Sequence, residues 1–170
     1  MLVEFNEREI STIKRIPKEN DKKIDVKKVY YGSGALLSET PYINGKIHGV
    51  KKVYYESGTL KLETPCVNGK VHGVEKYYSE SGALWWETPY VNGKKQGLWK
   101  RYSESGTLNG ELPYINSKEY GVRKWYYESG ALEWERPYVN DKFHGVVKGY
   151  DESGKLLRTI EYKNDKRVSK

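Results

Sequence analysis

Apolar and polar residues alternate in short runs along this chain. Residues 48–71 show the pattern: HGVKKVYY and TLKLETPCV are rich in Val, Tyr, Thr and Leu, and the sequences ESG and NGK separate such runs. β-branched and aromatic residues favour strands, whereas Gly, Asn and Ser favour turns. No helical periodicity is present. The pattern therefore predicts an antiparallel hairpin with strands over 48–55 and 59–67.

This unit is repeated along the chain. Its turn glycines recur every 24 residues, at Gly34, Gly58, Gly82, Gly106, Gly130 and Gly154. Such a period is typical of repeat arrays, in which each unit contacts only its neighbours. We therefore expect an all-β protein that forms an elongated, single-layer antiparallel β-meander of tandem hairpin repeats.

The repeats define three parts of the chain. Residues 26–162 form the repeat array, and residues 1–25 keep its register although Ile10 replaces the turn glycine, which predicts a degenerate N-terminal capping repeat. Residues 163–170 form a basic C-terminal tail that would protect the last strand edge with charge.

Charged columns predict how the strands align. If Ser57-Gly58 and Gly69-Lys70 are two-residue turns, Glu63 lies opposite both Lys52 and Lys76. Opposite charges that face each other across strands contribute roughly 0.2–1 kcal/mol each, and a slip by one residue would remove every such pair. This register places Lys and Glu on one face and Leu62 with its alternate neighbours on the other. A proline near the end of each second strand lacks an N–H group, which predicts a bulge or bend in every repeat.

The tryptophans depart from the repeat, because they cluster in the middle copies between Leu84 and Trp134. Trp85 and Trp86 are adjacent on one strand, so alternation predicts that they point to opposite faces, with Trp86 on the aromatic one. Exposed Trp and Tyr near Arg have the composition of a protein-binding site. Better packing in the middle of the sheet is the alternative reason for these residues. The candidate partner-binding residues are Trp86, Tyr90, Trp99, Tyr114, Trp125, Trp134 and Tyr138.

Composition limits the classes of partner that the protein is expected to bind. The chain has a formal net charge of +7, with 36% hydrophobic and 14% aromatic residues. A basic surface suits an acidic protein partner, an anionic membrane or nucleic acid. Glutamate in every copy disfavours nucleic acid. The sequence does not define an oligomeric state.

The sequence predicts no enzyme, no metal and no cofactor. His48, His72 and His144 each precede a strand-opening glycine, and Gln96 and Tyr120 take the same place in other copies. A catalytic or metal-binding histidine would require a unique constellation of residues rather than a repeated one. The single cysteine, Cys66, replaces a repeat tyrosine and is expected to pack in the sheet core.

The first ten residues bear on localisation, since they include four charged residues and lack the apolar segment of a signal peptide. We therefore expect a cytoplasmic protein. An envelope or secreted location stays open for a form whose leader has been removed.

The sequence also resembles a known family. ETPYVNGKKQG (Glu87–Gly97) followed by LWKRYSESG (Leu98–Gly106) is similar to the MORN repeat, in the bacterial variant (MORN_2) of YwqK-type antitoxin proteins. The resemblance implies an elongated single-layer sheet that binds proteins or, in some members, membranes, and its antitoxin branch implies neutralisation of a toxin. From the repeats and the resemblance we predict a non-catalytic, protein-binding scaffold of the antitoxin or immunity type. The alternatives are a peripheral protein of anionic membranes and a structural surface or spacer protein.

Overall fold

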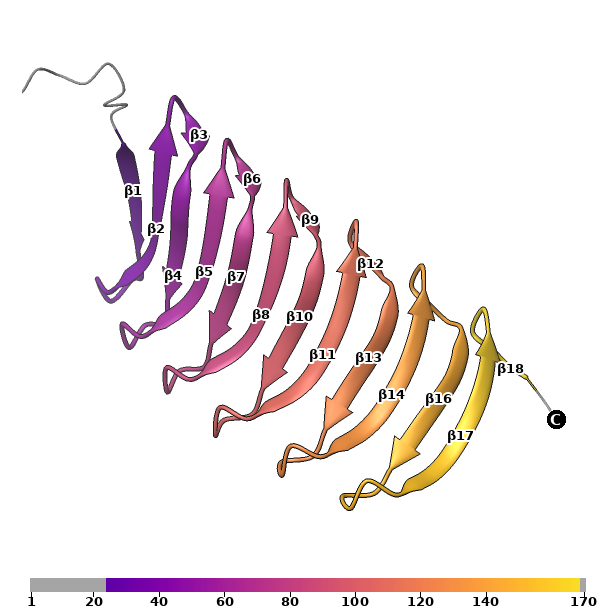
Figure 1. Ribbon diagram of the computed structural model, residues 1–170. Coiled ribbons are helices and arrows are strands. Elements are labelled where there is room, and N and C mark those ends of the chain that lie inside the picture. Colours follow the sequence, from indigo (N-terminus) through magenta and orange to yellow (C-terminus); the bar gives the residue numbers. More distant parts are fainter. Residues whose placement is uncertain (1–23, 169–170) are drawn as a thin grey trace, which may run out of the picture.

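The computed structural model describes residues 24–168 as one open antiparallel sheet with no helix in that range (Figure 1). The long strands are β1 (Asp25–Tyr30), β2 (Leu36–Ile43), β4 (Gly49–Tyr54), β5 (Leu60–Val67), β7 (Gly73–Tyr78), β8 (Leu84–Val91), β10 (Gly97–Tyr102), β11 (Leu108–Ile115), β13 (Gly121–Tyr126), β14 (Leu132–Val139), β16 (Gly145–Tyr150) and β17 (Leu156–Lys163). Short two-residue strands follow each second long strand: β3 (Lys46–Ile47), β6 (Lys70–Val71), β9 (Lys94–Lys95), β12 (Lys118–Glu119), β15 (Lys142–Phe143) and β18 (Lys166–Arg167).

Each long strand pairs with the long strands before and after it, so the chain runs as an uninterrupted meander from β1 to β17. Figure 1 shows the hairpins side by side in a long, curved ribbon with the described termini at opposite ends. The predicted fold class is therefore confirmed. The predicted capping repeat lies almost wholly outside the described residues.

The predicted charge register is confirmed. Lys52 lies opposite Glu63 across β4 and β5, and Glu63 lies opposite Lys76 across β5 and β7. Because side chains alternate along each strand, this register fixes which residues share a face over the regular parts of the array.

The two-residue turn predicted at Ser57-Gly58 is wrong. Gly58 N donates a hydrogen bond to Tyr55 O over 2.9 Å, and Tyr55 N donates to Thr59 O over 2.8 Å. Three residues therefore form the turn, and Gly58 ends it with a φ of 87°. A β-bulge at Lys61 compensates for the extra residue, which is why the charge pairs still align.

The second turn also differs from the predicted one. Asn68 and Gly69 form it with φ angles of 52° and 82°, so Val67 faces Lys70. Two positive φ angles are typical of a type I′ turn, whose twist matches that of the two strands of a hairpin. The turn therefore lies one residue earlier than Gly69-Lys70.

A bulge or bend was predicted at the proline of every repeat, but Pro65 lies inside the continuous strand β5 and the irregularity is in the facing strand, at His72. His72 N donates to Pro65 O over 2.9 Å, and the next residue, Gly73, has a φ of 116°. A Cβ atom on Gly73 would lie 3.0 Å from Pro65 Cγ. The proline ring and the positive φ both require glycine here, and the strand breaks into β6 and β7 at this point.

The core lies on one surface of the sheet. We call the surface that carries the Lys52–Glu63 column and its equivalents the ladder face, and the opposite surface the aromatic face. Among residues 24–168 the register places every buried residue on the aromatic face, and these are Thr40, Thr64, Cys66, Thr88, Gly110, Leu112, Tyr138, Val147 and Gly149. Cys66 is therefore a packed residue, as predicted, and burial raises the pKa of its thiol.

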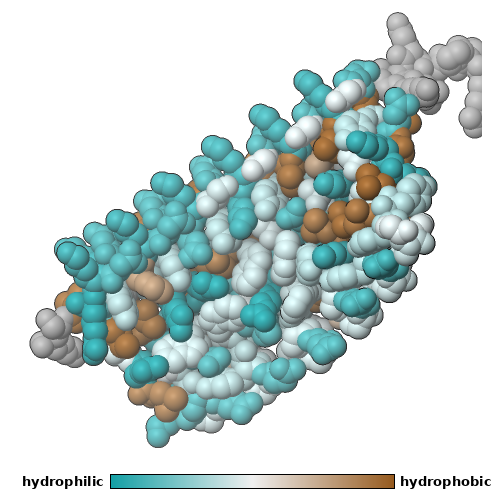
Figure 2. All heavy atoms as spheres, turned by 180° about the vertical axis from the view of Figure 1, so that it is seen from behind, coloured by the Kyte–Doolittle hydropathy of each residue, from teal (hydrophilic) through white to brown (hydrophobic). Residues whose placement is uncertain are grey.

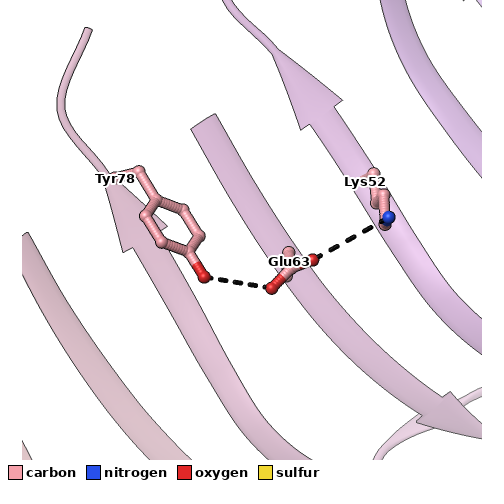
Figure 3. A network of polar contacts seen from close by, with 3 residues as sticks. All are labelled: Lys52, Glu63 and Tyr78. Carbon is pink, nitrogen blue, oxygen red and sulfur yellow. Dashed lines mark hydrogen bonds and ion pairs between the residues drawn. The ribbon is translucent and has the colours of Figure 1, made fainter. Parts of the chain in front are cut away.

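Polar groups on the ladder face form repeated chains of three. Lys52 Nζ lies 4.0 Å from one carboxylate oxygen of Glu63, and Tyr78 OH donates to the other over 3.1 Å (Figure 3). Three further Tyr–Glu bonds repeat this contact at 2.8–3.0 Å, namely Tyr102–Glu87, Tyr126–Glu111 and Tyr150–Glu135. The glutamates of this column are thus held by lysine or tyrosine side chains of the same face.

These tyrosines give the fold an alkaline pH dependence. Burial and then the hydrogen bond to glutamate raise the pKa values of Tyr78, Tyr102 and Tyr126 from 10.0 to about 12. Between pH 10 and 12 the folded state keeps protons that the unfolded state has released. The contribution of these tyrosines to the free energy of unfolding is therefore fully present below pH 10 and is lost as the pH rises through that window.

Thermal unfolding of the wild type and of a variant with Phe at all three positions tests this dependence. The melting temperature of the wild type should fall more steeply above pH 10 than that of the variant, because lysine deprotonation is common to both. Parallel curves would contradict the assignment.

Candidate functional site

The predicted binding residues lie on one face. The register places Trp86, Tyr90, Trp99, Tyr114, Trp125, Trp134 and Tyr138 all on the aromatic face. Trp86 stacks on Tyr77 with ring centroids 5.2 Å apart, and Trp99 meets Trp125 edge to face at 6.2 Å. The three tyrosines form a separate row beside the short strands, where Lys95 lies 4.8 Å from the ring centroid of Tyr114.

Trp125 and Trp134 form the centre of the site. They face each other across β13 and β14 and lean apart over two glycines. A Cβ atom on Gly110 would lie 2.6 Å from Trp125 Cζ3, and one on Gly149 would lie 2.8 Å from Trp134 Cζ3. Each indole thus lies close against the backbone of a neighbouring strand, which only a residue without a side chain permits.

Four arginines surround these two rings. The guanidinium carbons of Arg101 and Arg123 lie 5.6 and 4.9 Å from the centroid of Trp125. Those of Arg136 and Arg158 lie 5.3 and 4.6 Å from the centroid of Trp134. These distances suit cation–π contacts. We call these four arginines and two tryptophans the Arg–Trp cluster.

No arginine of this cluster lies within ion-pair distance of a carboxylate among residues 24–168, although burial raises the pKa of the Glu119 carboxyl and the charge of Arg123 opposes that shift. The ion pairs among residues 24–168 join lysines to glutamates on the ladder face, and none includes an arginine. Within the same residues, Arg123 Nε is buried and has no hydrogen-bond acceptor. Arginine presents a fork of N–H donors that matches a carboxylate, so the cluster holds unused donors for acidic groups.

The predicted opposite orientation of Trp85 and Trp86 is wrong. The centroids of both indoles lie close to that of Tyr77, at 5.9 Å for Trp85 and 5.2 Å for Trp86. Trp85 stands at the bulge position, where two residues of one strand oppose a single residue of the next and alternation is interrupted. Because its ring lies beside Tyr77, which is on the aromatic face, Trp85 belongs to the candidate site rather than to the ladder face, and it is 45% exposed.

Sequence reasoning missed Gly110 and Gly149, which shape the site. The equivalent positions of other repeats carry larger side chains. Leu62 and Trp86 correspond to Gly110, and Tyr77 and Arg101 correspond to Gly149. A glycine inside a strand indicates close approach of another group, and each of these glycines lies opposite a tryptophan. That coincidence was the available signal.

The histidines remain apart, one to a repeat. His72 Nδ1 accepts a hydrogen bond from Asn92 N over 3.4 Å, and His144 Nδ1 lies 3.3 Å from Asn164 Oδ1. Each of these two contacts the next repeat. Within residues 24–168 no group of three or more His, Cys, Asp and Glu residues is placed to hold a metal ion.

The exposed surface is mixed in polarity. In Figure 2 apolar residues are scattered among polar ones, without one continuous apolar patch on the face that is seen. The described residues include no helix long and apolar enough to cross a membrane. A charged and aromatic surface of this kind suits recognition by polar contacts and rings.

The structure is an open sheet of tandem hairpins. Each hairpin repeat has one turn that begins with asparagine, as at Asn68, and one that ends with glycine, as at Gly58. This arrangement defines a class of β-repeat protein. The chain belongs to the MORN repeat variant family, whose pattern matches residues 47–68, 71–92, 95–116, 119–140 and 143–164. The family is generally non-enzymatic, and its repeats generally form scaffolds for protein or membrane interactions.

Comparisons with other proteins add little beyond the family. One similar solved structure is a chain in the crystal structure of accessory secretory protein 1,2 and 3 in Streptococcus pneumoniae, with 12% identity and a TM-score of 0.23. The match covers 85% of this chain but only 20% of that one. No curated protein matches the sequence.

Proposed function

We propose that this chain is a non-catalytic scaffold that binds an acidic protein partner through its aromatic face. The difference in charge between the two faces carries the proposal. On the ladder face four lysines pair with glutamates, namely Lys28, Lys52, Lys100 and Lys148. Every arginine among residues 24–168 lies instead on the aromatic face, and these are Arg101, Arg123, Arg136, Arg158 and Arg167.

The stacked arrangement makes these arginines suitable for binding. An arginine that lies over an indole keeps its side chain in place while its N–H edge stays available, so less conformational entropy is lost when a carboxylate arrives. Arginine and tryptophan are also the residues in which binding energy is concentrated at protein interfaces. The C-terminal half of the aromatic face is therefore the binding surface.

Within this proposal, neutralisation of a toxin is the specific role suggested by the resemblance to YwqK-type antitoxin proteins. Co-expression with the protein encoded beside it should yield a stable complex and relieve the toxicity of that neighbour. A neighbour that is harmless, or that stays toxic and fails to co-purify, would remove the antitoxin role while leaving the scaffold.

Anionic membrane is the second candidate, because the same excess of arginine attracts acidic lipid headgroups. Sedimentation with vesicles that contain 30% phosphatidylserine tests it at low and at high salt. We expect no more than weak, salt-sensitive binding, since the side of the molecule seen in Figure 2 has no continuous apolar area to insert. Tight sedimentation at physiological salt would make the membrane the partner instead.

A further inference from the structure

A tyrosine column along one edge of the aromatic face ties neighbouring repeats together. Tyr31, Tyr55 and Tyr127 occupy the same position at the start of the glycine turn. Their hydroxyl groups donate to backbone carbonyls of the next repeat, at 2.7 Å to Tyr54 O, 2.9 Å to Tyr78 O and 2.9 Å to Tyr150 O. Each of these phenol rings thus fills the space between the glycine turns of two neighbouring hairpins.

Two consecutive repeats lack this ring, because Ser79 and Ser103 hold its position. Their hydroxyl groups bond within their own turns, where Ser79 Oγ accepts from Ala83 N over 3.2 Å and Ser103 Oγ accepts from Thr107 N over 3.2 Å. Within residues 24–168, no side-chain donor reaches Tyr102 O, which corresponds to the carbonyl that Tyr55 binds one repeat earlier.

The space between the Ser79 turn and the Ser103 turn is a hollow in the surface. Its volume is about 170 Å³, and its lining is Ser79, Ala83, Leu84, Trp85, Ser103 and Glu104. A cavity of roughly 150 Å³ is known to hold one benzene ring, so the space suits a single aromatic side chain.

The hollow adjoins the aromatic face. Trp85, which lines it, lies 5.9 Å from the ring of Tyr77. One repeat earlier, Tyr55 OH lies 3.4 Å from Tyr77 OH, so a ring in this column reaches the same face. The exposed indole of Trp85 provides a surface against which a second ring can pack.

We propose that this hollow receives the side chain of a tyrosine from the protein partner. The incoming phenol takes the place that the chain's own tyrosine takes in other repeats: its ring packs beside Trp85, and its hydroxyl donates to Tyr102 O. The inference rests on the proposed function for the source of the tyrosine, and it adds an aromatic anchor to the acidic contacts made at the Arg–Trp cluster.

The first test uses p-cresol, which is the tyrosine side chain alone, and follows the amide and indole signals of the protein by NMR. A fragment of this size should bind with a dissociation constant on the order of 10 mM. Signals of Trp85, Ser103 and Tyr102 should shift, whereas those of Trp125 and Trp134 should not. Shifts spread over all exposed aromatic residues, or no shifts, would overturn the proposal.

The second test fills the hollow from within. Ser79→Tyr should weaken p-cresol binding by at least 10-fold, and it should raise the melting temperature by about 2 °C or more because the ring completes the column. Ser57→Tyr places the same side chain on an exposed turn tip and should change neither value. A Ser79→Tyr variant that melts lower than the wild type, or that still binds p-cresol, would show that the hollow does not fit a tyrosine.

The two proposals can fail separately. If p-cresol does not bind but a partner still requires the arginines, the hollow is not an anchor site and the scaffold function stands. If p-cresol binds but no protein partner is found, the pocket stands and the scaffold function fails. Self-association that Ser79→Tyr abolishes would assign the hollow to a second copy and overturn the partner's tyrosine.

Discussion

Replacement of Gly73 by alanine should destabilise the protein by about 2–4 kcal/mol. Gly73 has a φ of 116°, and a Cβ atom there would lie 3.0 Å from Pro65 Cγ and 3.3 Å from Pro65 Cβ. Both the backbone strain and the contact with a rigid ring oppose the change. Chemical denaturation measures the loss.

The chain provides a matched control for this substitution. A Cβ atom on Gly32 would have open space for 4 Å around it, and this glycine has no positive φ, so Gly32→Ala should change the free energy of unfolding by less than about 0.5 kcal/mol. Hydrogen exchange in Gly73→Ala should increase first in the repeats on either side, because an array is stabilised by neighbouring contacts. Equal losses for the two variants would contradict the role assigned to the proline.

Removal of the four arginines of the Arg–Trp cluster should have the largest effect on binding. With the partner recovered by co-purification, alanine at Arg101, Arg123, Arg136 and Arg158 should weaken binding at least 100-fold, about 3 kcal/mol in total. The salt dependence of the association rate should also decrease, because charges steer acidic partners. Calorimetry and stopped-flow mixing measure the two quantities.

The ladder face offers the control for charge. Alanine at Lys28, Lys52, Lys76 and Lys100 removes the same number of positive charges from the opposite surface and should change affinity less than 3-fold, about 0.7 kcal/mol. Equal weakening by both sets would mean that net charge, rather than the aromatic face, determines binding.

The sequence predicted the fold well because every repeat carries the same information. The spacing of Lys52, Glu63 and Lys76 was sufficient for the register. It was insufficient for the turns, because a turn that is longer by one residue and a bulge at Lys61 cancel in the pairing beyond them. The charge pairs depend only on the combined effect of the longer turn and the bulge, so they could not reveal the bulge. Trp85 was therefore placed on the wrong face.

The shared face of the candidate residues was predicted from the sequence. Alternation along regular strands placed Trp86, Trp125 and Trp134 on one face, as the structure has them. It could not show that the indoles lie over Gly110 and Gly149, because a one-dimensional pattern does not tell which way a ring leans. The hollow at Ser79 was equally hidden, since a serine in a turn has a sufficient local role in satisfying backbone groups.

The most direct test of the central claim compares two adjacent residues that face opposite ways. Leu98 and Trp99 lie on a regular part of β10, where Leu98 pairs with Pro113 on the ladder face and Trp99 pairs with Leu112 on the aromatic face. A photoreactive benzoylphenylalanine placed at either position in the protein's own cells reports what touches each face. We predict a crosslinked protein from position 99 and none from position 98; crosslinks to a protein from position 98 alone, or only to lipid from position 99, would contradict the account.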